Sequence, residues 1–405
     1  MQGETVLCIS TAAWNGLWRP IHQTMSRIAH HNLVLFFEPG RNPERRHSSE
    51  MRRNCPNFYR LCSQRLDQNL VVIATPPCLP YMRQHLPRAV LQVTVPWVAR
   101  INAWILIRHV RWAMRALDVH EPILWLYEPR HIHLVGRLGE KLVCYYNYDE
   151  GPEYMPNRRI KELLREYDDR LSRRADVVMA TGRAQWERRK KLNPDTYFIP
   201  NAVDFDLFST ALVHETPIPS DVAQLKEPRI GYVGWLGYQI DVDLLLRVAT
   251  AYPDASLILV GPDEIPTDER LAMLRAMANV HFLGRKALTE LPGYLKAFDA
   301  ALIPYVLASY TLTAYPLKLH EYLAAGRAVV ATALPEVRPY SHVVRIAASH
   351  DEFVRQIGEA LRDNSPQAIH ARVAVARENT WDQRVAEIYR VLQHHLAATA
   401  QQRAR

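Results

Sequence analysis

The residues of this chain that most directly suggest chemistry are a lysine and a glutamate three positions apart, Lys318 and Glu321. Proline is tolerated in the first turn of a helix and glycine ends helices, so Pro316 and Gly326 predict a helix with both side chains on one face. An ammonium group near a helix N-terminus suits a diphosphate, and a carboxylate one turn further along accepts hydrogen bonds from ribose hydroxyls. The pair therefore indicates a nucleotide site. The alternative is an ordinary ion pair on a surface helix.

Length and composition are those of a two-domain globular protein. The chain has 405 residues, 48% hydrophobic content and a formal net charge of +8, which favours anionic ligands or surfaces. No recognisable nucleic-acid-binding motif accompanies this charge, so we expect no nucleic-acid partner. The five cysteines are scattered without a C-x-x-C pair, which argues against a disulfide framework and a zinc site and favours a reducing cytoplasm.

No segment reads as a signal peptide or a membrane span. The apolar run Val6–Ile9 is too short for a signal peptide and polar residues follow it at once. The most apolar window, Ala89–Ile107, is interrupted by polar residues and a proline. We therefore expect no transmembrane segment.

Short β-branched runs alternate with helix-length segments in both halves of the chain, a pattern typical of βαβ units and parallel sheets. The predicted strands are Thr5–Ser10, Leu33–Glu38, Leu70–Ala74, Ile123–Tyr127 and Leu142–Tyr146, followed by Arg229–Val233, Ser256–Val260, Val280–Leu283, Ala300–Pro304, Ala328–Ala331 and Val343–Ile346. They predict an α/β protein with two doubly wound, Rossmann-like domains, residues 1–207 and 228–380. The proline-containing segment 208–227 is the predicted linker.

Glycines follow several of the predicted strands. In open parallel sheets, ligands bind at the carboxyl ends of strands near the switch in strand order. Gly16, Gly234 and Gly261 lie in such segments and would allow the backbone to approach a ligand closely. A plain tight turn is the alternative at each position.

Taken together, these features resemble the GT-B glycosyltransferases of family 4, the glycosyltransferases group 1. The motifs that carry the resemblance are Trp18–Pro20, Tyr146–Asp149, Ala175–Ala180, Ile199–Asp204, Ile230–Gly234, Leu259–Pro262, Phe282–Arg285, Ala301–Pro304 and the Pro-x-Lys-x-x-Glu block within 316–326. The resemblance covers nearly the whole chain. It implies the GT-B fold, with two domains facing a central cleft, an acceptor bound by the N-terminal domain and a nucleotide sugar bound by the C-terminal domain.

The resemblance also implies which residues hold the donor. Lys318 would bind the diphosphate and offset the charge that grows on the departing nucleotide, and Glu321 would bind the ribose hydroxyls. Backbone around Gly261 and after Leu283 would line the base pocket. The expected donor-binding residues are Lys318, Glu321, Leu317, Thr313, Tyr310, Gly234, Gly261, Leu283, Arg285 and Gly16. The donor, a UDP or GDP sugar, would be a co-substrate, with no metal and no other cofactor.

Two positions depart from the larger family. Thr313 stands where that family has a second glutamate, and Gly234–Gly237 stand where it has a basic pair. The site therefore resembles the branch with the Pro-x-Lys-x-x-Glu block, in which lysine and hydroxyl groups bind phosphate. The candidate hydroxyl donors are Ser309, Tyr310, Thr311 and Thr313.

Asp149 follows an apolar strand and is the candidate general base, needed if the anomeric centre inverts during transfer. Gly151 and Pro152 come soon after it, so a helix cap or a turn is the alternative. Glu150 and His22 are further candidates, although His22 also suits the first turn after Pro20.

The segment 97–117 predicts a helix with two different faces. One face is apolar and suits packing on a sheet: Ala99, Ala103, Leu106, Val110, Ala113, Met114 and Leu117. The other combines arginines with rings that favour a membrane boundary: Trp97, Arg100, Ile101, Trp104, Arg108, Arg111, Trp112 and Arg115. This acceptor or membrane face predicts docking on an anionic membrane. The alternatives are that residues 41–60 cover the tryptophans or that they stack on arginines.

The predicted function is transfer of a sugar from a nucleotide-diphosphate donor to a hydroxyl of a glycan acceptor, during surface polysaccharide or glycolipid biosynthesis. Because the basic face would meet a membrane, we expect the acceptor to be linked to a lipid diphosphate. The enzyme would be cytoplasmic and peripherally bound to the inner face of the membrane. The resemblance implies that the C-terminal helix, residues 381–405 with Thr380 as N-cap, crosses back to the N-terminal domain. The alternatives are a non-catalytic GT-B subunit that binds a glycan or a partner, and a sugar-nucleotide epimerase or hydrolase.

Overall fold

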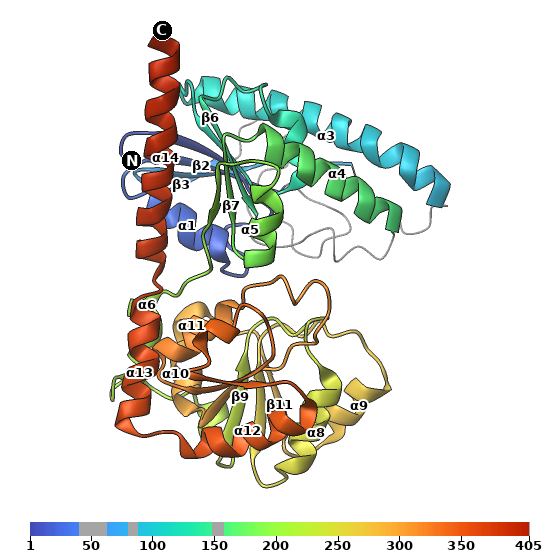
Figure 1. Ribbon diagram of the computed structural model, residues 1–405, viewed down its shortest axis with the longest axis vertical. Helices are drawn as coiled ribbons and strands as arrows, with labels where there is room; N and C mark the ends of the chain where they lie inside the picture. Colours follow the sequence, from blue (N-terminus) through green and yellow to red (C-terminus); the bar gives the residue numbers. More distant parts are fainter. Residues whose placement is uncertain (40–62, 80–87, 148–157, 405) are drawn as a thin grey trace. The chain divides into compact units, whose positions relative to one another are not determined.

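The structure is a computed structural model that describes residues 1–39, 63–79, 88–147 and 158–404. The chain divides into two compact units (Figure 1). Unit 1 is Met1–Pro200 together with the C-terminal segment from Val385, and unit 2 is Asn201–Arg384. Each unit contains a predominantly parallel sheet between helices, so the predicted α/β class with two Rossmann-like domains is confirmed.

Unit 1 is built on a sheet whose strands lie in the order β3-β4-β2-β1-β5-β6-β7-β8. The strands are β1 (Thr5–Ile9), β2 (Leu33–Glu38), β3 (Ser63–Asp67), β4 (Leu70–Ala74), β5 (Ile123–Leu126), β6 (Leu142–Asn147), β7 (Val177–Ala180) and β8 (Thr196–Phe198). All pairings are parallel except that of β3 with β4. The inner strands are apolar throughout because helices cover both faces of the sheet.

Two apolar cores lie on the two faces of this sheet. The helices of unit 1 are α1 (Pro20–Ile28), α3 (Arg88–Ala116), the 3₁₀ helix η1 (Pro129–Leu134), α4 (Arg158–Arg174), α5 (Arg183–Lys190) and most of α14 (Trp381–Ala404). Helices α3 and α4 contribute to one core, and α1 and α14 contribute to the other. In the described part of the chain, no helix combines the length and apolarity needed to cross a bilayer.

Unit 2 has a fully parallel sheet in the order β11-β10-β9-β12-β13-β14. Its strands are β9 (Arg229–Val233), β10 (Ser256–Val260), β11 (Val280–Gly284), β12 (Ala300–Ile303), β13 (Ala328–Thr332) and β14 (Val344–Ala347). Its helices are α6 (Phe205–Phe208), η3 (Ser209–Leu212), α7 (Ser220–Ala223), α8 (Val242–Ala251), α9 (Glu269–Ala276), η4 (Leu288–Glu290), α10 (Leu291–Ala297), α11 (Leu317–Ala324), η5 (Arg338–Tyr340), α12 (His350–Arg362) and α13 (Pro366–Arg377).

The unit boundaries differ from the domain boundaries that the sequence suggests. Segment 208–227, the predicted linker, belongs to unit 2, and the chain changes unit at Pro200. The reason is burial, because Phe208, Ala211 and Val222 lie in a core of unit 2. Helix α14 begins in unit 2 with Thr380 as its cap, since the Gln383 N–H donates to the Thr380 hydroxyl at 3.3 Å, and it continues in unit 1.

Candidate functional site

The order of strands in unit 2 locates a candidate site. The chain passes from β9 to β10 and β11 on one side of the sheet, then returns to place β12, β13 and β14 on the other. The order therefore switches between β9 and β12, and ligands of open parallel sheets bind at the carboxyl ends of the strands that flank such a switch. The segments that follow these two strands contain Gly234 and Lys318.

Helix α11 presents Lys318 in its first turn. Pro316 is the N-cap in extended conformation, one position earlier than the sequence predicts, and the helix is followed by Gly326 at a φ of +71°. The ammonium of Lys318 donates to the Glu321 carboxylate at 3.0 Å. The two side chains are only 17% and 13% exposed, so this is not the freely solvated surface pair of the alternative reading. The pair lies at the positive end of the helix dipole.

Glycines bring three backbone segments together at this place. The N–H of Gly234 donates to Val260 and the N–H of Gly261 donates to Gly284, each at 2.8–2.9 Å. A Cβ on Gly261 would lie 1.7 Å from the Gly234 carbonyl oxygen, and a Cβ on Gly234 would lie 2.6 Å from Cε of Lys318. The predicted residues Gly234, Gly261 and Lys318 therefore converge, and only glycine fits at the two turns.

Two buried tyrosines, Tyr232 and Tyr322, hold the backbone on either side of this convergence. The hydroxyl of Tyr322, on α11, bonds both the N–H and the carbonyl of Val233, the last residue of β9, at 2.8 and 3.2 Å. The Tyr232 hydroxyl donates to the Trp235 carbonyl at 2.9 Å. Burial, together with the neighbouring tyrosines, raises the pKa of Tyr232 well above its usual range, so its hydroxyl remains a proton donor.

Three of the four hydroxyl groups predicted to bind phosphate form hydrogen bonds with the backbone instead. Tyr310 donates to the Tyr238 carbonyl at 2.8 Å, and Thr313 donates to the Tyr310 carbonyl at 3.1 Å. Thr311 is buried and bonds the backbone of its own turn. Ser309 is exposed. These contacts give the segment after β12 a defined shape, with Ser309 the candidate whose hydroxyl lies at the surface.

The remaining donor residues lie at the margins of the convergence. Leu317 is half-buried and directly precedes Lys318. Leu283 is half-buried at the end of β11 and Arg285 is exposed, on either side of Gly284. Gly284 is the residue whose carbonyl binds Gly261, which ties the end of β11 to the same set of turns.

In unit 1 the order of strands switches between β1 and β5, and the predicted Gly16 lies in the segment after β1. His22, in the first turn of α1, is buried and stacks on Trp18 with ring centroids 4.9 Å apart. Its Nδ1 accepts the Arg19 N–H at 2.9 Å, so Nε2 carries the proton and donates to the Ala13 carbonyl. Burial lowers the pKa of His22 to about 4. His22 is therefore a neutral capping side chain rather than an available base.

The candidate base Asp149 and its neighbour Glu150 lie outside the described residues. Asn147, the last residue of β6, is described and buried, and its amide donates to the Tyr145 hydroxyl at 3.1 Å. That hydroxyl donates to Asp168 of α4 at 2.5 Å. The carboxyl end of β6 is thus anchored to a buried acid.

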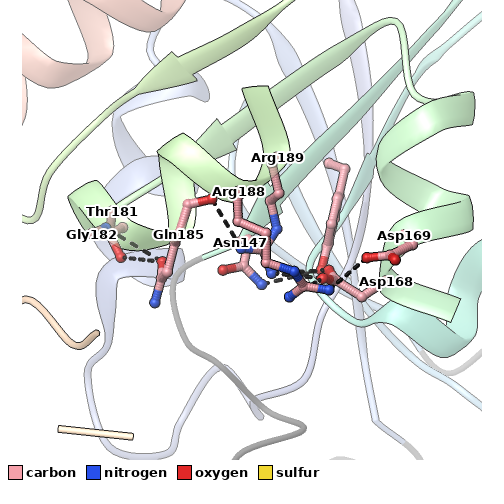
Figure 2. A network of polar contacts seen from close by, with 9 residues as sticks. Asn147, Asp168, Asp169, Thr181, Gly182, Gln185, Arg188 and Arg189 are labelled. Carbon is pink, nitrogen blue, oxygen red and sulfur yellow. Dashed lines mark hydrogen bonds and ion pairs between the residues drawn. The ribbon is translucent and has the colours of Figure 1, made fainter. Parts of the chain in front are cut away.

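Figure 2 shows how this acid is neutralised. Arg189 of α5 binds both oxygens of Asp168 at 2.9 and 3.0 Å, with both side chains fully buried. Arg188 contacts Asp168 at 3.1 Å and also donates to the half-exposed Asp169 at 2.5 Å. The network links α4, α5 and β6, and so fixes the strand end that leads towards Asp149.

Sequence reasoning missed Glu38, a buried acid at the carboxyl end of β2. Its Oε2 accepts the Trp14 N–H at 3.0 Å, which holds the segment that contains Gly16 against the neighbouring strand. The signal was present in the sequence, because a carboxylate ends the apolar run Leu33–Phe37.

Helix α3 has the two different faces that the sequence predicts. The predicted apolar residues from Ala99 to Met114 are buried, and Leu117, just past the end of the helix, is half-buried. The opposite residues, Trp97, Arg100, Ile101, Trp104, Arg108, Arg111, Trp112 and Arg115, are exposed. Arg100 lies over Trp97 and Arg108 over Trp104, yet these rings remain 60% and 58% exposed. Residues 41–60, the other proposed cover, lie outside the described residues.

Metal ligands do not gather at either site within the described ranges, where no three His, Cys, Asp or Glu side chains form a group that could hold a metal ion. The groups that the site of unit 2 offers to a ligand are instead an ammonium, a carboxylate and closely spaced backbone.

Comparison with known proteins finds sequence similarity over most of unit 2 and over part of the chain. Residues 227–363 match the family described as glycosyl transferases group 1. A curated relative, the putative teichuronic acid biosynthesis glycosyltransferase TuaH of Bacillus subtilis (strain 168), is 26% identical over 231 residues, which are 55% of this chain and 58% of that protein. The match therefore spans little more than half the length of that relative.

Solved structures share the fold over nearly the whole chain. The sucrose-phosphate synthase of Thermosynechococcus elongatus superposes with a TM-score of 0.68 at 15% identity, covering 98% of this chain and all of that one. Anabaena HepE in complex with UDP and glucose has a TM-score of 0.64 at 15% identity, covering 97% and 100%. Most of unit 2 therefore matches the family glycosyl transferases group 1, and the chain as a whole shares its fold with these solved structures.

Proposed function

We propose that this protein is a glycosyltransferase that moves a sugar from a nucleotide-diphosphate donor to a hydroxyl of a lipid-linked glycan, without a metal. The observation that carries the proposal is the position of Lys318. Its ammonium lies in the first turn of α11, against Gly234 and beside the strand-order switch of unit 2. One of its three N–H bonds goes to Glu321, and within the described residues no further partner takes the other two. These suit the oxygens of a diphosphate.

The chemistry follows from the charge of the leaving group. Negative charge grows on the nucleotide diphosphate as the glycosidic bond breaks, and a fixed ammonium at the positive end of a helix stabilises that charge. Glu321 keeps Lys318 in place and offers its second oxygen to ribose hydroxyls. Asp149 remains the proposed base for an inverting reaction.

We further propose that the acceptor is lipid-linked and that the enzyme works at the inner face of the membrane. The support is the acceptor or membrane face of α3, where exposed arginines alternate with exposed tryptophans. Each basic residue near an anionic surface contributes about 1 kcal/mol, so its four arginines favour reversible attachment. The similarity to TuaH, a putative teichuronic acid biosynthesis glycosyltransferase, supports a product in a surface polysaccharide.

The experiment that tests the donor proposal is a thermal-shift screen without added metal. The ligands are uridine, guanosine, adenosine and thymidine diphosphates and their sugar conjugates, including UDP because HepE was solved with it. We expect saturable stabilisation by one nucleotide, weakened at least about tenfold in Lys318→Ala. Lys226→Ala, which removes an exposed lysine of the same unit, is the control. Equal binding by Lys318→Ala would contradict the assignment, and no shift with any nucleotide would favour a non-catalytic subunit.

A further inference from the structure

Three aromatic side chains of unit 2 form a continuous set, and the expected donor-binding residues include only one of them, Tyr310. The ring centroids of Trp235 and Tyr238 are 4.9 Å apart at 81°, and those of Tyr238 and Tyr310 are 5.1 Å apart at 80°. Tyr238 is 41% exposed, and the other two are half-buried. We call Trp235, Tyr238 and Tyr310 the aromatic corner, because each ring stands nearly perpendicular to the next.

The aromatic corner straddles the strand-order switch. Trp235 and Tyr238 follow β9, and Tyr310 follows β12, so the two loops that flank the switch each contribute to it. Trp235 comes directly after Gly234, whose Cβ position would lie 2.6 Å from Cε of Lys318. The aromatic corner therefore begins one residue from the proposed diphosphate site.

The loop that carries Trp235 is held rigidly. The backbone carbonyl of Trp235 accepts two hydrogen bonds, from the Tyr232 hydroxyl at 2.9 Å and from the Gln239 side-chain amide at 2.6 Å. The Trp235 ring lies on Gly237, where a Cβ would be 2.5 Å from the indole. The Tyr310 hydroxyl fixes the opposite side of the corner by its bond to the Tyr238 carbonyl. Such preorganisation lowers the entropic cost of binding a ligand.

The geometry of the rings indicates what they would bind. A planar base is best enclosed between parallel rings, whereas consecutive rings of the aromatic corner stand at about right angles. A pyranose has an apolar C–H face and a rim of hydroxyls, and it suits one exposed ring face beside a second ring edge. We propose that the aromatic corner is the subsite for the donor's sugar, and so a determinant of which sugar is transferred. This inference rests on the proposed function.

The test compares each nucleoside diphosphate with its sugar conjugate by titration calorimetry on the full chain. The pairs are UDP with UDP-glucose, GDP with GDP-mannose and ADP with ADP-glucose. Tyr238→Ala and Tyr310→Ala should each weaken binding of the sugar conjugate about tenfold, which corresponds to about 1.4 kcal/mol, and leave binding of the free diphosphate within about twofold. Tyr310→Phe keeps the ring and should retain most of the affinity for the conjugate.

Met273→Ala, which removes an exposed apolar side chain of α9, is the matched control and should bind both ligands as the wild type does. Equal losses for the diphosphate and the conjugate would overturn the inference, because the rings would then serve the base or the loop shape. Unchanged affinities would overturn it too. If the wild type binds neither member of any pair, the proposed function itself fails and the inference falls with it.

Discussion

The ammonium of Lys318 and the carboxylate of Glu321 lie 3.0 Å apart on the first two turns of α11, and both are largely buried. A buried ion pair is weak evidence for a role in stability, because desolvation of the two charges offsets much of their attraction. Its position beside two glycine turns at the strand-order switch indicates a ligand site instead. The pair orients the lysine while leaving a carboxylate oxygen for a second contact.

Glu321→Gln should remove the preference for ribose over deoxyribose. A hydrogen bond to a charged group contributes about 1.5–3 kcal/mol, so the wild type should bind a ribonucleoside diphosphate about tenfold or more tightly than its 2′-deoxy form. The variant should bind both alike. Titration calorimetry with UDP and 2′-deoxy-UDP, or the pair for whichever base binds, measures the ratio. A ratio that survives the substitution would show that Glu321 does not hold the ribose.

Gly261→Ala should destabilise unit 2 by about 3 kcal/mol or more, because its Cβ would overlap the Gly234 carbonyl and because φ is +145°. Gly284→Ala is the control for backbone strain alone, since its φ is +68° but nothing lies within 4 Å of its Cβ position. That variant should lose only about 1–2 kcal/mol. Urea unfolding followed by circular dichroism compares them, and equal losses would argue against the close contact.

Asp168→Ala should destabilise unit 1 by about 3–5 kcal/mol, since it leaves the fully buried Arg189 without its carboxylate. Asp169→Ala removes the adjacent, half-exposed partner of Arg188 and should cost less than about 1 kcal/mol. Each substitution removes one carboxylate, so a difference between their free energies of unfolding reports the burial of Asp168 rather than the loss of charge. Chemical unfolding measures both, and a small loss for Asp168→Ala would contradict the importance of the network in Figure 2.

Replacing Arg100, Arg108, Arg111 and Arg115 by alanine should weaken binding to vesicles of phosphatidylglycerol and phosphatidylcholine at least about tenfold. The control removes the same charge from exposed arginines of unit 2: Arg247, Arg270, Arg355 and Arg362. It should sediment with vesicles as the wild type does. Equal effects of the two variants would mean that net charge, rather than the face of α3, governs the association.

Stability should fall as the pH drops from about 6.5 towards 4. Burial lowers the pKa of His22 to about 4, whereas the same side chain in the unfolded chain titrates near 6.5. Between these values the unfolded state binds the extra proton, so the free energy of unfolding decreases by up to about 1.4 kcal/mol per pH unit. Above pH 6.5 this contribution is complete and constant. His22→Gln should show a shallower decline in urea unfolding across that window, and an unchanged slope would contradict the assignment.

Local patterns in the sequence were sufficient for much of the fold. Apolar β-branched runs predicted eleven strands of the two sheets to within a residue or two, because strands covered on both faces must be apolar throughout. The edge strand β3 was missed because it is polar, and β7 and β8 were missed because runs of four and three residues are too short to give a clear strand signal. The two sides of α3 followed from helical periodicity alone.

By itself, the sequence determined the order of strands and helices, the helix that bears Lys318 and Glu321, and the family resemblance. Only the tertiary structure decided which of these residues meet. Three contacts join segments that follow or belong to different strands and helices: Gly261 with Gly234, Lys318 with Gly234, and Arg189 with Asp168. Periodicity describes what each segment must bury, whereas such contacts depend on how the buried faces pack together. For the same reason, the chain changes unit at Pro200 rather than at the predicted residue 207, because Phe208 and Val222 are buried in a core of unit 2.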